Sequence, residues 1–348
     1  MSTLTRETEP PGAAQLRRSA AVRVAWLLAG VAVIVVLSVL SLAVGVKSVS
    51  VSEVLAALSG DSSTVATAAV TNRMPRTVLA LIVGAGLAVS GLALQAVTRN
   101  PIADPGILGI SNGAALAIVI GIVFFGLSHP YAYIGVAIIG AAGAAIFVYA
   151  VGSLGRGGAT PLKLALAGAA SAAAFASLSS AILLPRVDAL TTFRFWQIGG
   201  VGGGTWDKIA IISPVLLLGW MVCLAIARGM NSLALGDDLA AGLGENVFRT
   251  RMIGLIGAVI LAGAATAIAG PIGFVGLVIP HICRLLIGTD HRWLVPFSAL
   301  AGAALLLLSD VVGRVIARPQ EIEVGIVTAI IGAPFFIWIV RRQKVREL

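Results

Sequence analysis

The sequence contains few charged residues: Asp, Glu, Lys and Arg together make up 11% of its 348 residues. Soluble domains usually carry about 25% of these residues, whereas 58% of this chain is hydrophobic. Its mean hydropathy is +1.02, and its 41 glycines are typical of helices that pack closely within lipid. The composition excludes a water-exposed globule and predicts a polytopic membrane protein.

Residues for disulfide, metal and nucleotide chemistry are also scarce. The two cysteines, Cys223 and Cys283, lie in or beside apolar stretches and do not support a disulfide scaffold. Three histidines are too few and too dispersed for a catalytic metal site. The P-loop pattern G-x-x-x-x-G-K-[ST] does not occur, so the chain does not bind ATP through a P-loop of its own. We therefore predict a protein that is not an enzyme and carries no cofactor or metal.

Uncharged apolar runs indicate how often the chain crosses the membrane, because a helix of about 20 apolar residues spans the hydrocarbon. Two runs are too long for one helix and are divided at 126–130 and 270–273. The predicted spans are 24–46, 77–98, two within 105–155, 164–185, 209–227, two within 252–283, 293–315 and 324–340. The predicted fold class is an all-α membrane protein of about ten transmembrane helices, with a membrane domain at 23–342 and short tails at 1–22 and 343–348.

The basic residues indicate the orientation of the chain. An even number of spans places both termini on one side, and with that side in the cytoplasm 16 of the 24 Lys and Arg residues are cytoplasmic and 8 are not. This bias follows the positive-inside rule and predicts cytoplasmic termini. The net charge of +9 is scattered and not gathered in one patch, which argues against a nucleic-acid partner.

Three connecting segments carry predictions of their own. Residues 49–60 begin with a serine cap and end in glycine, which predicts a short surface helix outside the membrane. Residues 187–206 are rich in aromatic residues and glycine, and we expect a flexible outer segment. Residues 229–250 form the longest cytoplasmic loop, which we expect to contain two short helices, 234–241 and 245–250, joined by a glycine-rich turn.

Few carboxylates are placed where they could do chemistry. Asp310 is the one that plausibly lies within a span, and Arg314 follows four residues later on the same helix face, so the pair can neutralise itself. The pair is either structural or functional. In both cases the sequence lacks the relay of ionisable groups that an ion-driven carrier needs, so the energy source is expected elsewhere. Asp237 and Asp238 lack the second acidic cluster of a magnesium–diphosphate site and favour a helix N-terminus.

Short motifs occur in a fixed order in and between the spans. They are Arg73-Met74-Pro75-Arg76, 84–91, Gln95, 99–105, 108–110, 270–281, 290–292, Asp310, Arg314, Glu321, 325–329 and 332–336. Together these motifs closely resemble the permease family of bacterial ABC importers for ferric siderophores, haem and vitamin B12. The resemblance extends from about residue 24 to residue 342.

The resemblance implies a function and a set of partners. Members of this family have ten helices in the bacterial cytoplasmic (inner) membrane and pair with a second permease, identical or homologous, so that substrate passes between the two. Separate ATPase subunits bind ATP and Mg²⁺ on the cytoplasmic face, and a binding protein delivers substrate outside. The implied cargo is a ferric siderophore, with haem or cobalamin as alternatives. An ion-gradient-driven secondary carrier is the alternative of another class.

The resemblance also implies candidate site residues. The loop 229–250 matches the helices that couple the permease to its ATPase, and the residues expected to form this contact are Gly236, Asp237, Asp238, Ala240, Gly242, Leu243 and Gly244. Arg73, Arg76 and Arg314 match outer arginines that receive acidic residues of the binding protein; as an alternative they anchor lipid headgroups.

Two further segments relate to the cargo. The small residues of 164–185 match the region that lines the translocation pathway, although small residues also simply permit close helix packing. Glu323 stands where the family often has proline. It could tune the choice of substrate or binding protein, but we favour ordinary variation.

Overall fold

The computed structural model describes residues 19–45, 48–106, 109–127, 129–154 and 160–342 of the chain. Residues 1–18 and 343–348, which cover nearly all of the two predicted tails, lie outside the described residues. All regular secondary structure within the described ranges is helical, which confirms the predicted all-α class.

Fourteen helices occur within these ranges. They are α1 (Ala20–Ala43), α2 (Val51–Leu58), α3 (Val65–Thr98), α4 (Ile110–Phe125), α5 (Pro130–Gly152), α6 (Pro161–Leu183), α7 (Val187–Gln197), α8 (Trp206–Ala225), α9 (Ala227–Leu233), α10 (Asp237–Gly242), α11 (Val247–Ala269), α12 (Val275–Ile287), α13 (His291–Ile316) and α14 (Val324–Arg342).

Seven of the helices are long and apolar enough to cross a membrane: α1, α3, α5, α6, α8, α11 and α13. Three shorter apolar helices, α4, α12 and α14, accompany them. Each span predicted from the sequence overlaps one of these helices. The chain is therefore a multi-pass membrane protein.

Helix α3 departs most from the predicted spans, because it begins at Val65 and not at residue 77. The Thr64 hydroxyl caps its first turn by accepting a hydrogen bond from the Thr67 N–H at 3.1 Å. The helix continues through Pro75 and past two arginines. The charges that mark a span boundary in the sequence do not end the helix, because their side chains find partners along its flank.

The connecting segments follow the predictions in part. Ser50 and Glu53 form the capping box of α2, with the Ser50 N–H donating to the Glu53 carboxylate at 2.8 Å, so the short helix predicted within 49–60 is confirmed. The prediction of a flexible segment at 187–206 is wrong for its first half, which forms α7. In the loop 229–250, α10 occupies the centre and α11 already begins at Val247.

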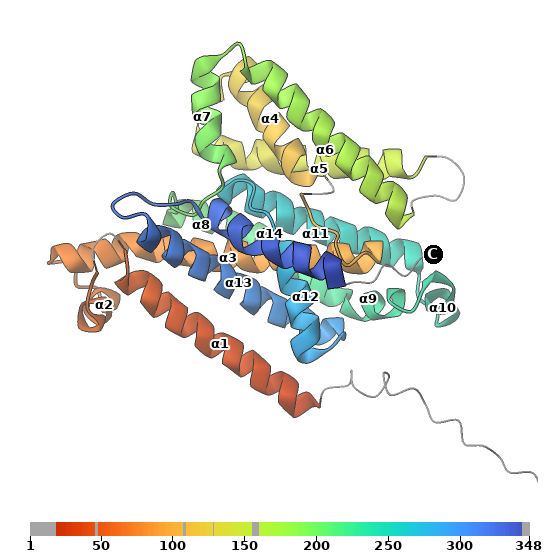
Figure 1. Ribbon diagram of the computed structural model, residues 1–348, viewed down its shortest axis with the longest axis horizontal. Coiled ribbons are helices and arrows are strands. Elements are labelled where there is room, and N and C mark those ends of the chain that lie inside the picture. The colour runs from red at the N-terminus through yellow and green to blue at the C-terminus, as the bar shows by residue number, and fades with distance from the viewer. Residues whose placement is uncertain (1–18, 46–47, 107–108, 128, 155–159, 343–348) are drawn as a thin grey trace, which may run out of the picture.

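Helix α3 lies at the centre of the bundle and packs against α11, α12 and α13 (Figure 1). In its most apolar window 78% of residues are buried, against 6% for the peripheral α1. Glycines allow the close crossings: a Cβ on Gly84 would overlap the Gly302 carbonyl of α13, and one on Gly91 would overlap the Gly276 carbonyl of α12.

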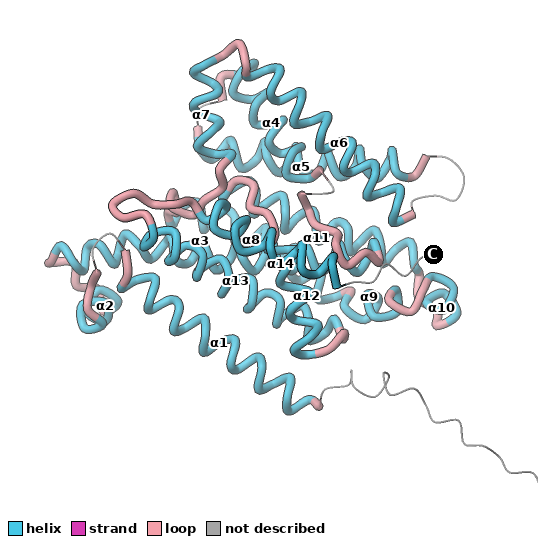
Figure 2. The backbone as a smooth tube through the Cα atoms, viewed as in Figure 1, coloured by secondary structure: helices cyan, strands magenta, loops and turns pink. Residues whose placement is uncertain are grey.

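The short helices α2 and α10 lie at opposite ends of the bundle (Figure 2). We call these the α2 end and the α10 end. The α2 end includes the first turns of α3 and the connection between α13 and α14. The α10 end includes the last turn of α3, α9 and the connection between α12 and α13. Both sets of candidate site residues lie at these ends.

Candidate functional site

The α2 end contains a buried cluster of ion pairs centred on Asp310. This carboxylate is fully buried and lies between two guanidinium groups, with Arg76 Nη2 at 2.8 Å and Arg314 Nη2 at 2.8 Å. Arg76 also pairs with Glu321 at 2.6 Å. The two arginines and two carboxylates balance in charge. We refer to Arg76, Asp310, Arg314 and Glu321 as the Asp310 cluster.

Arg314 uses its guanidinium to join α13 to the end of α1. Its Nη1 donates to the backbone carbonyls of Ser41 at 2.9 Å and Val44 at 3.0 Å, and its Nη2 donates to the Ser41 hydroxyl at 2.7 Å. The residue is only 1% exposed. Because its charge and hydrogen bonds are satisfied inside the bundle, Arg314 holds the end of α1 against α13.

The remaining charged residues of the α2 end lie nearer the surface. Arg73 is half-buried and donates from Nη1 to the Leu42 carbonyl at 2.9 Å. Glu323 is half-buried beside Gly200. Burial raises the pKa of the Glu323 carboxyl above its ordinary value, and the nearby Arg76 guanidinium opposes that shift.

The α10 end presents an exposed knob made of α10 and the turn that follows it. Leu239 and Leu243 are 63% and 67% exposed, whereas Ala240 is buried and anchors the helix. The Asp237 carboxylate forms an ion pair with Arg251 at 2.8 Å and lies 3.8 Å from the Arg99 guanidinium. These two contacts hold α10 against α11 and the end of α3. We call residues 235–244 the α10 knob.

Two glycines of the α10 knob differ in what they allow. Gly244 has a φ of +83°, in the left-handed region, which lets the chain turn back into α11. Gly242 has no atom within 4 Å of the position that a Cβ would occupy. The knob is therefore fixed at its base by Asp237 and has open space around Gly242.

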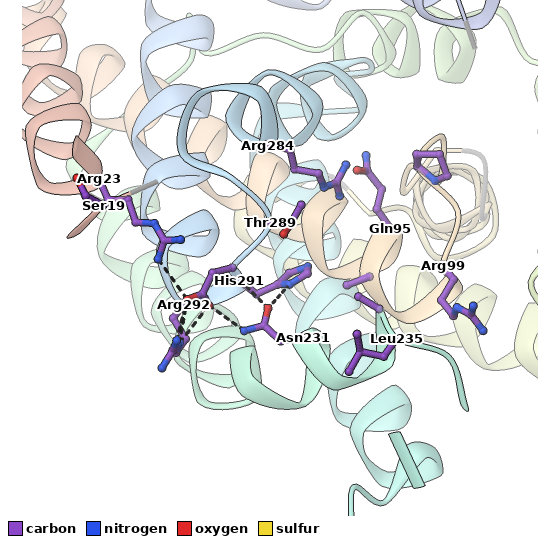
Figure 3. Close-up of a pocket in the computed structure, with 14 residues that line it drawn as sticks. Ser19, Arg23, Gln95, Arg99, Asn231, Leu235, Arg284, Thr289, His291 and Arg292 are labelled. Atoms are coloured by element: carbon purple, nitrogen blue, oxygen red, sulfur yellow. Dashed lines mark hydrogen bonds and ion pairs between the residues drawn. The ribbon is translucent and has the colours of Figure 1, made fainter. Parts of the chain in front are cut away.

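A polar cavity of about 1070 Å³ lies beside the knob, between α1, α3, α9, α12 and α13 (Figure 3). On one wall, Asn231 Oδ1 accepts hydrogen bonds from the backbone N–H and from Nδ1 of His291, each at 2.8 Å. Asn231 Nδ2 donates to Asp290 at 2.8 Å. Burial raises the pKa of Asp290, but hydrogen bonds from Arg292 and Asn231 outweigh burial and hold that pKa well below its usual range.

Comparison with known proteins identifies this architecture. The model of the FecCD transport family matches residues 33–342. The chain belongs to this family. It is 43% identical to the ferric enterobactin permease FepD of Escherichia coli over 311 residues, which cover 89% of this chain and 93% of FepD. It is 45% identical to the siderophore permease YfiZ of Bacillus subtilis, over 78% of this chain and 81% of YfiZ.

A solved structure agrees with the FecCD family assignment. It is an inward-facing conformation of a metal-chelate type ABC transporter, with a TM-score of 0.79 and 31% identity, covering 92% of this chain and 99% of that one. The resemblance found from the motifs is thus confirmed. FecCD-family relatives also include the hemin permease HmuU of Yersinia pestis, at 40% identity.

The structure distributes the predicted site residues of this FecCD-family chain unequally. It brings Gly236, Asp237, Asp238, Ala240, Gly242, Leu243 and Gly244 together in one knob. Of the three arginines predicted to dock a binding protein, Arg73 is half-buried at the α2 end, and Arg76 is 13% exposed and pairs with Asp310 and Glu321. Arg314 lies deeper, and its buried guanidinium contacts Asp310, Ser41 and Val44. Asp310 and Arg314 form the pair that their spacing of four residues predicts.

Other residues were given no role by the sequence. Arg284 is one, although its position as the single charge within the apolar α12 could have drawn attention to it. Beside α6, a smaller cavity of about 250 Å³ is lined by both apolar and polar side chains of α4, α6 and α7, the polar ones including Asn112, Ser179 and Arg194. This cavity lies along the segment predicted to line the pathway.

Proposed function

We propose that this FecCD-family chain is the membrane subunit of an ATP-driven importer that carries a ferric siderophore across the bacterial cytoplasmic membrane. The observation that carries this proposal is the 43% identity to the ferric enterobactin permease FepD over 89% of the chain. The exposed α10 knob supports it, because a permease without a P-loop needs a surface that takes force from a separate ATPase.

The proposed topology has ten membrane-spanning helices with both termini in the cytoplasm. The α10 end then faces the cytoplasm and the α2 end faces outward. The distribution of arginines supports this orientation, since the α10 end carries Arg23, Arg99, Arg228, Arg249, Arg251, Arg284 and Arg292.

The proposed partners are assigned to the two ends. An ATPase subunit, which holds ATP and Mg²⁺, binds the α10 knob on each of two paired permeases, and closure of the ATPases moves the knobs and switches the dimer between outward- and inward-facing states. An extracytoplasmic binding protein docks at the α2 end, where Arg73 and Arg76 steer its acidic residues.

The first test is co-purification of the chain from its native membrane in mild detergent, followed by mass spectrometry. We expect an ATPase subunit and either one or two kinds of permease. The second test is uptake of radioactive ferric siderophore into proteoliposomes that contain the purified complex and internal ATP, with the binding protein added outside and with haem and cobalamin as competing cargoes.

The outcomes separate the candidate functions. Uptake that needs ATP and persists when the ion gradient is collapsed supports the importer. Uptake of haem or cobalamin instead reassigns the cargo within the family. Absence of an ATPase under gentle conditions, together with loss of uptake on collapse of the gradient, overturns the importer in favour of a secondary carrier.

A further inference from the structure

We propose that the cavity beside the α10 knob is a binding site for a phosphate-bearing anion that also carries a hydroxyl group. The chemistry fits the glycerol-phosphate headgroup of an anionic lipid or a soluble phosphate monoester. The site goes beyond the proposed transport function, and its place at the cytoplasmic membrane surface rests on the topology proposed above.

The lining of the cavity has an excess of positive charge. Four arginines and one aspartate line it: Arg23, Arg99, Arg284, Arg292 and Asp290. Asp290 is shared by Arg292 at 2.8 Å and Arg23 at 3.5 Å. One carboxylate therefore serves two arginines before any other group of the cavity is considered.

Among the four arginines of the cavity, Arg284 is the one whose guanidinium is left unsatisfied. The residue is half-buried on α12, and its guanidinium forms no hydrogen bond or ion pair with any residue that the structure describes, whereas Arg23, Arg99 and Arg292 each pair with a carboxylate. A guanidinium group has five N–H donors and cannot lose its charge in a protein. Because Arg284 is partly removed from water, a bound anion would stabilise its charge, and its planar N–H donors match the oxygens of phosphate.

Two buried acceptors face the same space as Arg284. Gln95 is 3% exposed and donates from Nε2 to the Gly276 carbonyl at 3.0 Å, which leaves its Oε1 without a partner. His291 is 5% exposed, and its Nε2 also has no partner. Figure 3 shows Arg284, Gln95 and His291 projecting from three different helices toward the space between them.

The hydrogen-bond network fixes the tautomer of His291. Asn231 Oδ1 can only accept, and its orientation is set by the backbone N–H of His291 and by the donation from Asn231 Nδ2 to Asp290. The bond between Asn231 Oδ1 and His291 Nδ1 therefore places the ring proton on Nδ1. Nε2 is left as an acceptor, so the ligand must bring a donor to it.

These unsatisfied groups define the ligand. Arg284 requires acceptor oxygens with negative charge, while Gln95 Oε1 and His291 Nε2 require hydrogen donors. A glycerol-phosphate headgroup supplies both, with a phosphodiester anion and neighbouring hydroxyls. A protonated phosphate monoester supplies both as well. Basic pockets between helices at the cytoplasmic membrane surface commonly hold anionic headgroups, and the exposed helix α1 forms one side of this cavity.

The test measures binding to the full-length chain, purified in mild detergent, by native mass spectrometry and isothermal titration calorimetry. The probes are phosphatidylglycerol, phosphatidylcholine, glycerol 3-phosphate and inorganic phosphate. We expect phosphatidylglycerol to bind in preference to phosphatidylcholine, and the Arg284→Gln variant to lose about tenfold or more in affinity. Arg284→Lys should retain part of the affinity, and Arg228→Gln, an exposed arginine outside the cavity, should behave as the unmodified chain.

The outcomes decide both the site and the source of its ligand. Competition by glycerol 3-phosphate or inorganic phosphate supports a soluble anion, and binding of the lipid alone supports a headgroup. Equal binding of phosphatidylcholine, or anion binding that is the same in Arg284→Gln, Arg284→Lys and the unmodified chain, overturns the proposal. A thermal unfolding curve for each variant controls for folding, and the Lys variant keeps the test decisive if Gln does not fold.

Discussion

The two ends of the bundle use arginine in different ways. At the α2 end, Arg314 is 1% exposed and its guanidinium is fully occupied by groups of the same chain. At the α10 end, the Asp237 carboxylate and its partner Arg99 are 45% and 43% exposed, and Arg284 has no partner within the described residues. Arg314 thus forms part of the fold, whereas Asp237, Arg99 and Arg284 remain available for partners.

The difference in burial sets how much each group of charges contributes to stability. Exposed ion pairs contribute about 0–1 kcal/mol. Removing one member of a buried pair costs about 3–5 kcal/mol, because the other charge is left buried without a partner. Substitutions at the two ends should therefore separate stability from function.

The largest expected effect is that of Arg314→Ala. The substitution leaves the Asp310 carboxylate with Arg76 alone and removes the hydrogen bonds to Ser41 and Val44, so we expect the free energy of unfolding to fall by about 3–5 kcal/mol. Thermal unfolding of the detergent-purified protein measures the change. Arg318→Ala at the exposed surface of the same end is the control. Equal unfolding temperatures for both variants would show that the Asp310 cluster does not support the fold.

At the α10 knob, by contrast, we expect a substitution to reduce transport without reducing stability. Gly242→Trp should leave the unfolding temperature unchanged, because a side chain at this position points into open space. ATP-driven uptake should fall by about tenfold or more, because the knob no longer fits its partner. Gly242→Ala is the matched control and should retain most activity. Gly244 is a poorer choice, since its φ of +83° makes any other residue strain the backbone.

The α10 end also carries a carboxylate that should make stability depend on pH. Burial raises the pKa of Asp104, between α3 and α4, from 3.8 to about 6, although the Gly106 N–H donates to it. The folded state binds this proton more tightly than the unfolded state. The contribution of Asp104 to the free energy of unfolding is therefore greatest below pH 4 and is lost as pH rises through about 6. Its upper bound is about 3 kcal/mol.

The Asp104→Asn variant isolates this contribution. The amide oxygen of asparagine can still accept from Gly106, but the side chain does not ionise. We expect the variant to be more stable than the unmodified chain at pH 7.5, and the difference to shrink as pH falls and to vanish below about pH 4, measured by thermal unfolding across that range. A pH dependence identical to that of the unmodified chain would exclude Asp104 as the titrating group.

The sequence predicts the helices well because apolar runs of membrane length have few other solutions. It predicts their ends poorly. The arginines before residue 77 predict that the helix starts there, yet α3 begins at Val65. The helix can include these arginines because Arg76 pairs with Asp310 and Glu321, which lie more than 230 residues away in the chain. The spacing of four between Asp310 and Arg314 reveals their pairing. It cannot reveal that Ser41 and Val44 close around Arg314, since those contacts depend on how α1 packs.

The same limit applies to the candidate sites. The α10 knob is formed by neighbours in sequence, so its residues could be found from the motif alone. The cavity next to it joins Gln95, Asn231, Arg284 and His291 from four helices. No local sequence pattern predicts that these four residues share a site, because the site depends on which of their hydrogen-bonding groups remain without a partner after folding.

The smallest effect on function is expected for Glu321→Gln, and it sharpens the contrast within the α2 end itself. Glu321 is 37% exposed and pairs only with the outer face of Arg76, so the free energy of unfolding should change by less than about 1 kcal/mol. The amide oxygen of glutamine can still accept from Arg76, but the negative charge beside Arg76 is lost and the α2 end becomes more positive. We therefore expect the affinity for an acidic binding protein to rise by about two- to fivefold at low salt. Surface plasmon resonance at two salt concentrations measures this change, with Arg76→Gln as the opposite control. If Glu321→Gln weakens binding instead, Glu321 itself contacts the partner, and the α2 end docks through its carboxylates as well as through its arginines.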